Sequence, residues 1–208
     1  MLELYLFINP IGTSCFNSEQ NILRLAEVLK DQLKFRFIPF INLETISSMM
    51  VENSLPLNNL NLRNRLFQKA YQASLDYKAA LFQGKKRGRE FLLNLQQEIF
   101  ENNISYCDQL VQQIAITSHL DWEMFTNDRR SNFTANSFRQ DLQMAAEMKV
   151  HSYPTIVISN LEGIDCGVSL TECISYQLLE DLCNGNFNDL LINQDNSKNH
   201  NIPHLHTL

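Results

Sequence analysis

The sequence lacks any apolar run close to the ~18 residues that a membrane-spanning helix needs. It also lacks an excess of positive charge. Its 17 Lys and Arg stand against 23 Asp and Glu, which gives a net charge of −6, whereas nucleic-acid-binding proteins usually carry a basic stripe. The first ten residues lack the basic start and the long apolar segment of a secretory signal. These absences predict a cytoplasmic protein that binds neither membranes nor nucleic acid.

The sequence is also without a Cys-x-x-Cys pair. Its five cysteines stand at positions 15, 107, 166, 173 and 183, and an odd number at irregular spacing argues against a disulfide framework. The last three do not have the spacing of a zinc site. Three histidines, at positions 200, 204 and 206, lie in an Asn-rich tail that we expect to be solvated. We therefore expect no metal and no cofactor.

What the sequence does contain is the composition of a globular protein, with 44% hydrophobic and 19% charged residues. Residues 2–8 are apolar at nearly every position, which is typical of a strand buried on both faces. Asn9–Gly12 breaks this strand. An apolar helix face follows at residues 22, 25, 26 and 29, and a second strand at residues 35–40. This order predicts a βαβ unit with parallel strands.

Between residues 43 and 148 the spacing of apolar residues is helical, and no strand is evident. We expect helices over residues 60–82, 91–100, 107–118, 121–127 and 137–148, with Gly84–Gly88 as an interruption between the first two. The strand pattern returns at residues 155–158 and continues, after a turn at 160–163, in a hairpin partner at 165–170. A helix over residues 171–183 closes the pattern.

Three segments of the chain resemble those of one family. Phe7–Phe16 (FINPIGTSCF) has the form strand–turn–helix, Ala79–Leu92 (AALFQGKKRGREFL) joins two helices, and Val150–Thr155 (VHSYPT) leads into a strand. In sequence and in position they resemble the DsbA-type branch of the thioredoxin superfamily. The resemblance and the order β-α-β, helices, β-β-α imply an α/β protein, namely a thioredoxin-like fold with an inserted all-helical domain.

The resemblance implies a division of the chain into three parts. Residues 1–42 and 149–190 would form a discontinuous thioredoxin-like domain, residues 43–148 the helical insertion, and residues 191–208 a mobile tail. It also implies a cis peptide bond between Tyr153 and Pro154, a bond geometry that is usually confined to proline. In the family this loop exposes backbone beside the active site, where an extended peptide can pair with it.

The resemblance also shows which part of the family's chemistry is missing. The family motif is Asp-Pro-x-Cys-x-x-Cys-Trp. Its first cysteine attacks from a helix N-terminus and its second resolves the mixed disulfide. Aligning Asn9-Pro10 with Asp-Pro puts Gly12 at the attacking position and Cys15 at the resolving position. The motif is therefore degenerate, and it cannot carry out the ordinary dithiol reaction.

Several roles stay open for Cys15. It can be a buried structural thiol, a monothiol that forms mixed disulfides or senses oxidation, or a catalytic thiol that works with a distant cysteine such as Cys107 or Cys166. Thr13 and Ser14 add another role, because the kappa-class glutathione transferases share this architecture and hold the glutathione thiolate with a serine near this turn. The catalytic alternatives are a thiol-disulfide oxidoreductase or isomerase, and a glutathione-linked transferase.

Among cytoplasmic DsbA-like proteins, the chain resembles the YjbH family of Gram-positive bacteria, also called SpxH. This resemblance implies an adapter, which binds the transcription regulator Spx and promotes its degradation by the ClpXP protease without redox catalysis. A binding scaffold needs a shaped surface rather than an attacking thiolate. The partner-binding residues that the resemblance suggests are Gly12, Thr13, Ser14, Cys15, Phe16, Tyr153 and Pro154.

Overall fold

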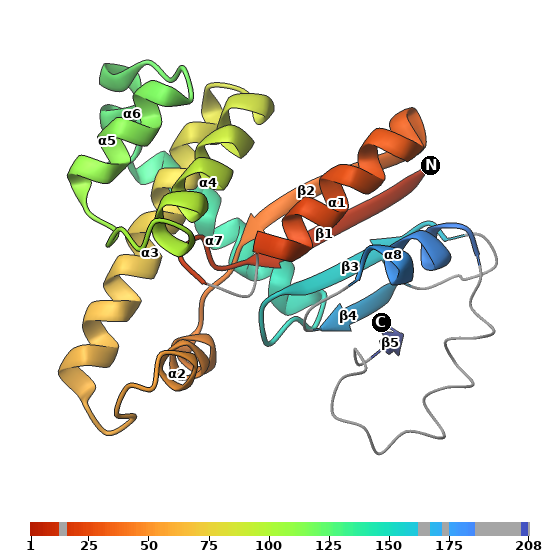
Figure 1. The fold of residues 1–208 in the computed structure, drawn as a ribbon, viewed down its shortest axis with the longest axis horizontal. Coiled ribbons are helices and arrows are strands. Elements are labelled where there is room, and N and C mark those ends of the chain that lie inside the picture. Colours follow the sequence, from red (N-terminus) through yellow and green to blue (C-terminus); the bar gives the residue numbers. More distant parts are fainter. Residues whose placement is uncertain (13–15, 162–166, 172–174, 186–204, 208) are drawn as a thin grey trace. The chain divides into compact units, whose positions relative to one another are not determined.

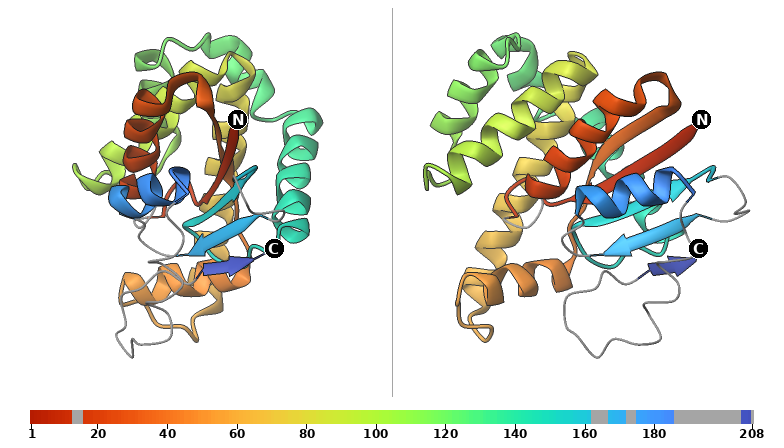
Figure 2. Two further views of the ribbon diagram at one scale, coloured as in Figure 1. Left: turned by 90° about the vertical axis from the view of Figure 1, so that its right-hand side faces the viewer. Right: turned by 45° about the vertical axis from the view of Figure 1, so that its right-hand side comes forward.

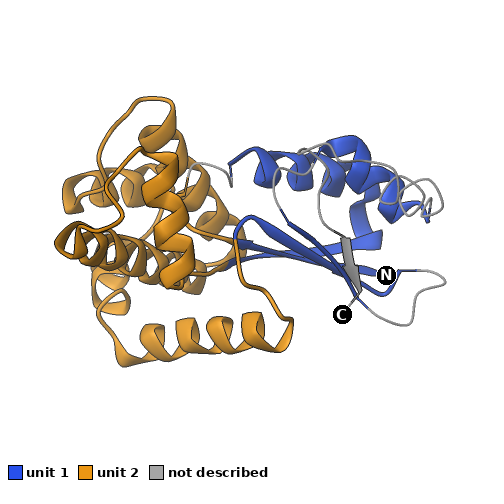
Figure 3. Cartoon of the chain, turned by 90° about the horizontal axis from the view of Figure 1, so that it is seen from below, with its two compact units in different colours: residues 1–7, 14–38, 153–208 blue, residues 8–13, 39–152 orange. Residues whose placement is uncertain are grey.

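The computed structural model describes residues 1–12, 16–161, 167–171, 175–185 and 205–207. The chain divides into two compact units (Figure 3), and each is described by itself. The sheet unit comprises residues 1–7, 14–38 and 153–208, and the helical unit comprises residues 8–13 and 39–152. The chain passes between the units after residues 7, 13, 38 and 152, so that residues 8–13 belong with the helices.

The sheet unit is built on five strands in the order β2-β1-β3-β4-β5. The strands are β1 (Leu2–Ile8), β2 (Leu33–Pro39), β3 (Thr155–Ser159), β4 (Val168–Thr171) and β5 (Leu205–Thr207). The pairs β1–β3, β3–β4 and β4–β5 are antiparallel. The N–H of Phe40, just after β2, donates to the carbonyl of Ile8, the last residue of β1, at 2.7 Å. The two strands therefore end side by side, as parallel neighbours do.

Two helices lie together on one face of this sheet, as both views in Figure 2 show: α1 (Phe16–Leu29) and α8 (Tyr176–Cys183). A short 3₁₀ turn, η2 (Lys30–Gln32), follows α1. The apolar face predicted for α1 is confirmed at Ile22 and Leu25, which are fully buried. The guanidinium of Arg24 lies 4.2 Å from the ring centroid of Tyr176, a cation–π contact that joins α1 to α8.

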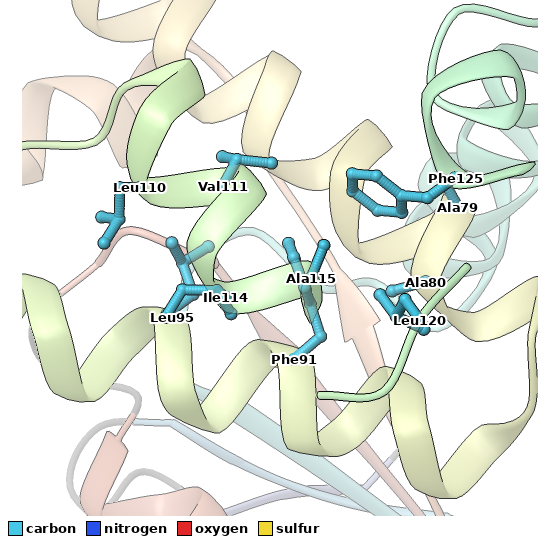
Figure 4. Close-up of a cluster of buried hydrophobic side chains, with 10 residues drawn as sticks. All are labelled: Ala79, Ala80, Phe91, Leu95, Leu110, Val111, Ile114, Ala115, Leu120 and Phe125. Atoms are coloured by element: carbon cyan, nitrogen blue, oxygen red, sulfur yellow. The ribbon is translucent and has the colours of Figure 1, made fainter. Parts of the chain in front are cut away.

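The helical unit contains six of the described helices, and Figure 1 shows their order. They are α2 (Leu43–Glu52), α3 (Leu60–Phe82), α4 (Lys85–Phe100), α5 (Asp108–Thr117), α6 (Trp122–Asp128) and α7 (Asn132–Glu147). One cluster of buried apolar side chains joins α3, α4, α5 and α6 (Figure 4). Its members are Ala79, Ala80, Phe91, Leu95, Leu110, Val111, Ile114, Ala115, Leu120 and Phe125. A second cluster joins α2, α3 and α7 around Ile46, Ala73 and Phe138.

Capping side chains explain where several helices begin. Asn59, Asp121 and Ser131 each accept a hydrogen bond from the backbone N–H three residues later, as N-cap residues do. Ser131 therefore starts α7 at Asn132, five residues before the predicted start at 137. Helix α2 lies in the region that was expected to be helical, but it was not predicted as a separate element. Its signal is a reciprocal capping box between Asn42 and Thr45.

The predicted interruption at Gly84–Gly88 is shorter than expected, because α4 already begins at Lys85. Gly84 has a φ of +119°, a conformation that favours glycine. Gly88 lies inside α4, where a Cβ atom would stand 2.6 Å from Leu81 Cδ2 and 2.9 Å from Leu81 Cα. Gly88 therefore permits the close approach of α4 to α3.

The C-terminal elements also differ from the expectation. β4 extends to Thr171, where the closing helix was predicted to begin, and α8 begins at Tyr176 because Ser175 caps it. The predicted mobile tail, 191–208, includes the three residues of β5, which pair with β4 from Leu205 to Thr207. Backbone pairing with β4 defines this strand. Three residues are too few to show the alternating apolar pattern by which a strand is predicted from sequence. Part of the predicted turn at 160–163, and Cys166 and Cys173, lie outside the described residues.

Candidate functional site

The turn after β1 is closed by its own backbone and by Asn9. The N–H of Gly12 donates to the carbonyl of Asn9 at 2.9 Å, and the N–H of Ile11 donates to Asn9 Oδ1 at 3.1 Å. The Asn9 side chain is fully buried, and its Nδ2 lies 3.9 Å from Met49 Sδ on α2. Asn9 therefore fixes the turn at the position where the family motif has an aspartate, and it does so without adding a charge.

Gly12 is the last described residue of this turn and is buried. It offers no side chain, so it provides no nucleophile at the attacking position of the motif. The predicted residues Thr13, Ser14 and Cys15 lie outside the described part of the chain. Phe16, the next residue, is half-buried and is the first residue of α1.

The loop before β3 has the predicted proline geometry. The Tyr153–Pro154 bond is cis, which confirms that prediction. Pro154 is buried and Tyr153 is half-buried. Thr155, which follows them, is paired with Phe7 near the end of β1. The register of the sheet thus places this loop at the C-terminal end of β1.

The candidate residues fall into two groups in the structure. Gly12 belongs to the helical unit, and Phe16, Tyr153 and Pro154 belong to the sheet unit. Sequence reasoning missed Asn42, which caps α2 and whose Nδ2 also donates to the carbonyl of His151 at 2.9 Å. Asn42 thereby fixes the backbone that leads to Tyr153. The sequence feature that could have identified Asn42 is its position, as a polar residue directly before an apolar helical pattern.

Two of the five cysteines have described side chains. Cys107 is exposed at the N-cap of α5 in the helical unit. Cys183 is half-buried at the end of α8, and burial raises the pKa of its thiol to about 11. At neutral pH Cys183 is therefore protonated and a poor nucleophile. No group of three His, Cys, Asp or Glu in the described ranges could hold a metal ion.

A buried ionic network holds the helical unit together. The guanidinium of Arg129 donates two hydrogen bonds to the carboxylate of Asp76 on α3, at 2.7 and 3.0 Å, and a third to Asp108 at 2.9 Å. Tyr106 Oη donates to the same Asp76 carboxylate at 2.6 Å. Burial raises the pKa of Asp76, while Arg129 lowers it. The arrangement provides partners for the fully buried Asp76 carboxylate, and we assign it a structural role.

No helix within the described residues has the length and apolarity to cross a membrane. Among solved structures, a protein of Nitrosomonas europaea superposes with a TM-score of 0.64 at 12% identity, covering 94% of this chain and 99% of that one. The oxidoreductase DsbA from Xylella fastidiosa superposes with a TM-score of 0.59 at 10% identity, covering 89% and 86%. These likenesses show the predicted DsbA-like, thioredoxin-like fold.

Curated relatives are more similar in sequence. The ClpXP adapter protein SpxH of Bacillus subtilis is 28% identical over 209 residues, and the match covers 87% of this chain and 66% of that protein. SpxH of Staphylococcus saprophyticus is 24% identical over 177 residues, covering 85% and 63%. The chain thus spans just under two thirds of the length of these relatives. The thioredoxin family model matches residues 5–181. The chain belongs to the thioredoxin family.

Proposed function

We propose that this protein is an adapter that binds the transcription regulator Spx in the cytoplasm and promotes its degradation by the ClpXP protease, without redox catalysis. The observation that carries the proposal is the similarity to proteins named ClpXP adapter protein SpxH over 87% of the chain. The residue at the attacking position agrees with it, because Gly12 has no thiol.

In this proposal the partner contacts the positions around Gly12, Thr13, Ser14, Cys15, Phe16, Tyr153 and Pro154. Tyr153 is the strongest candidate for a contact, because half-buried tyrosines combine a large apolar face with a polar end. Tyrosine is also enriched among the residues that dominate binding energy at interfaces. The family resemblance implied a cis peptide bond before Pro154, and the structure has this bond.

The alternative function is thiol chemistry at Cys15. It rests on the fold, which this chain shares with the oxidoreductase DsbA from Xylella fastidiosa. A likeness at 10% identity carries the fold and not the activity. The alternative requires Cys15 to react as a thiolate.

Isothermal titration calorimetry with purified Spx under reducing conditions tests the proposal. We expect the wild-type chain to bind Spx, and Tyr153→Ala to weaken binding about tenfold or more. Tyr176→Ala is the matched control, since Tyr176 is also a half-buried tyrosine of the sheet unit. It should leave the affinity unchanged. Absence of heat with the wild-type chain would overturn the choice of Spx, and equal effects of the two variants would move the contact surface elsewhere.

A further inference from the structure

The corner between α3 and α4 concentrates positive charge in an acidic chain. Residues 84–89 (Gly-Lys-Lys-Arg-Gly-Arg) hold four Lys and Arg and no acid, whereas the remainder of the chain holds 13 Lys and Arg and 23 Asp and Glu. Lys85, Lys86 and Arg87 form the first turn of α4, and all three are exposed. The corner therefore differs in sign from the protein as a whole.

The helix itself adds to this positive charge. The N-cap of α4 is Gly84, which makes no side-chain capping bond, and the first turn contains no acidic residue. The free N–H groups at a helix N-terminus amount to roughly half a positive charge, which anions stabilise and cations oppose. Three cations in this turn are thus unfavourable for the helix. An anionic group of another molecule would be attracted both by the three cations and by the free N–H groups of the helix.

Among the described residues, acidic side chains do little to neutralise Lys85, Lys86 and Arg87. Lys86 faces Glu90 at 3.9 Å, and its side chain is 85% exposed, so the attraction is weak. Lys85 and Arg87 have no ion-pair partner within the described ranges. Asp121, which exchanges two hydrogen bonds with Gln83, uses its carboxylate to cap α6.

An aromatic pair with one half-buried and one exposed ring includes Phe82, three residues before Lys85 in the chain. Phe82, the last residue of α3, and Phe133, at the start of α7, have ring centroids 4.9 Å apart. Phe133 is 68% exposed, which no other described large apolar side chain exceeds. It takes no part in the two buried clusters of the helical unit. Aromatic residues and Arg are enriched at protein–protein interfaces.

We propose that this basic corner, formed by Phe82, Lys85, Lys86, Arg87 and Phe133, binds an acidic segment of a protein partner. Carboxylates of that segment meet the cations and the N-terminus of α4, and one of its apolar side chains packs on Phe133. The acidic remainder of the chain disfavours a long polyanion such as a nucleic acid, which needs a continuous basic surface. The inference goes beyond the adapter proposal and does not depend on the identity of its partner.

Fluorescence anisotropy with a labelled 12-residue peptide of Asp and Glu around one central Phe tests this proposal on the full chain. We expect Lys85→Glu/Arg87→Glu to weaken binding about tenfold, because two attractions become repulsions. The matched reversal Arg65→Glu/Lys69→Glu changes two exposed cations of α3 and should leave binding unchanged. Phe133→Ser should weaken binding several-fold, and because Phe133 is exposed the variant should fold.

Two further probes decide between partners. The same peptide with Asn and Gln in place of Asp and Glu should not bind, and a labelled 12-nucleotide single-stranded DNA should bind more weakly than the acidic peptide. Tighter binding of the DNA would overturn the proposal in favour of nucleic acid. Equal losses in the two charge reversals would overturn it in favour of unspecific attraction. Because no probe contains Spx, a negative result here leaves the adapter proposal standing.

Discussion

Charged side chains of the helical unit lie in two opposite environments. In its interior, Asp76 and Arg129 are 0% and 4% exposed and share two hydrogen bonds. At the basic corner, Lys85 and Arg87 are exposed and have no ion-pair partner within the described ranges. A buried charge without a partner costs several kcal/mol, whereas an exposed charge is solvated at little cost. The interior charges therefore fix the shape of the unit, and the corner charges remain available to a partner.

The largest expected effect comes from breaking the interior pair. Arg129→Met leaves the fully buried Asp76 without its counter-charge and should lower the free energy of unfolding by about 3–5 kcal/mol. Urea denaturation measures this loss. The adjacent exposed residue gives the control, since Arg130→Met should change stability by less than about 0.5 kcal/mol. Similar losses in both variants would show that the buried Asp76–Arg129 pair contributes no more to the free energy of unfolding than an exposed arginine does.

The pH dependence of the Arg129→Met variant sharpens this test. Burial raises the pKa of Asp76 and Arg129 lowers it, so removing Arg129 raises the pKa further. A carboxyl whose pKa is higher in the folded than in the unfolded state stabilises the fold while it is protonated. That contribution is lost as the pH rises from the unfolded pKa through the folded one. The deficit against wild type should therefore be larger at pH 8 than at pH 5, and equal deficits would contradict the assignment.

The smallest effect has the opposite sign and comes from the corner. Lys85→Glu replaces a cation by an acid in the first turn of α4 and should raise the free energy of unfolding by about 0.3–1 kcal/mol. The same change should weaken binding of the acidic peptide. Lys69→Glu, within α3 and remote from its ends, provides the control for stability. A destabilised Lys85→Glu variant would mean that Lys85 has a structural role inside the protein.

The sequence was sufficient for those elements whose pattern is local. The apolar run of β1 and the face of α1 at Ile22 and Leu25 can be predicted from their spacing alone. The cis bond before Pro154 followed from the family resemblance and not from spacing. Helix α2 was missed, although Asn42 precedes an apolar helical pattern there, because its capping box pairs Asn with Thr instead of the usual Ser or Thr with Glu.

Features that depend on distant parts of the chain could not be predicted. Asp76 and Arg129 are 53 residues apart in sequence, and no local pattern marks either one as buried. Arg129 is buried although the adjacent Arg130 is exposed, and the two arginines have no local feature that distinguishes them. Gly88 was interpreted as part of a helix break. Its role depends on how closely α3 and α4 approach each other, which the fold alone determines.

The most direct test of the central claim is a reconstituted degradation assay. Spx, ClpXP and ATP are combined under reducing conditions with no addition, with the wild-type chain, or with Cys15→Ser, and loss of Spx is followed on gels. We expect the wild-type chain to accelerate degradation several-fold and Cys15→Ser to accelerate it equally, because Gly12 and Cys15 provide no dithiol. No acceleration by the wild-type chain, or acceleration that is lost in Cys15→Ser, would contradict a thiol-independent adapter.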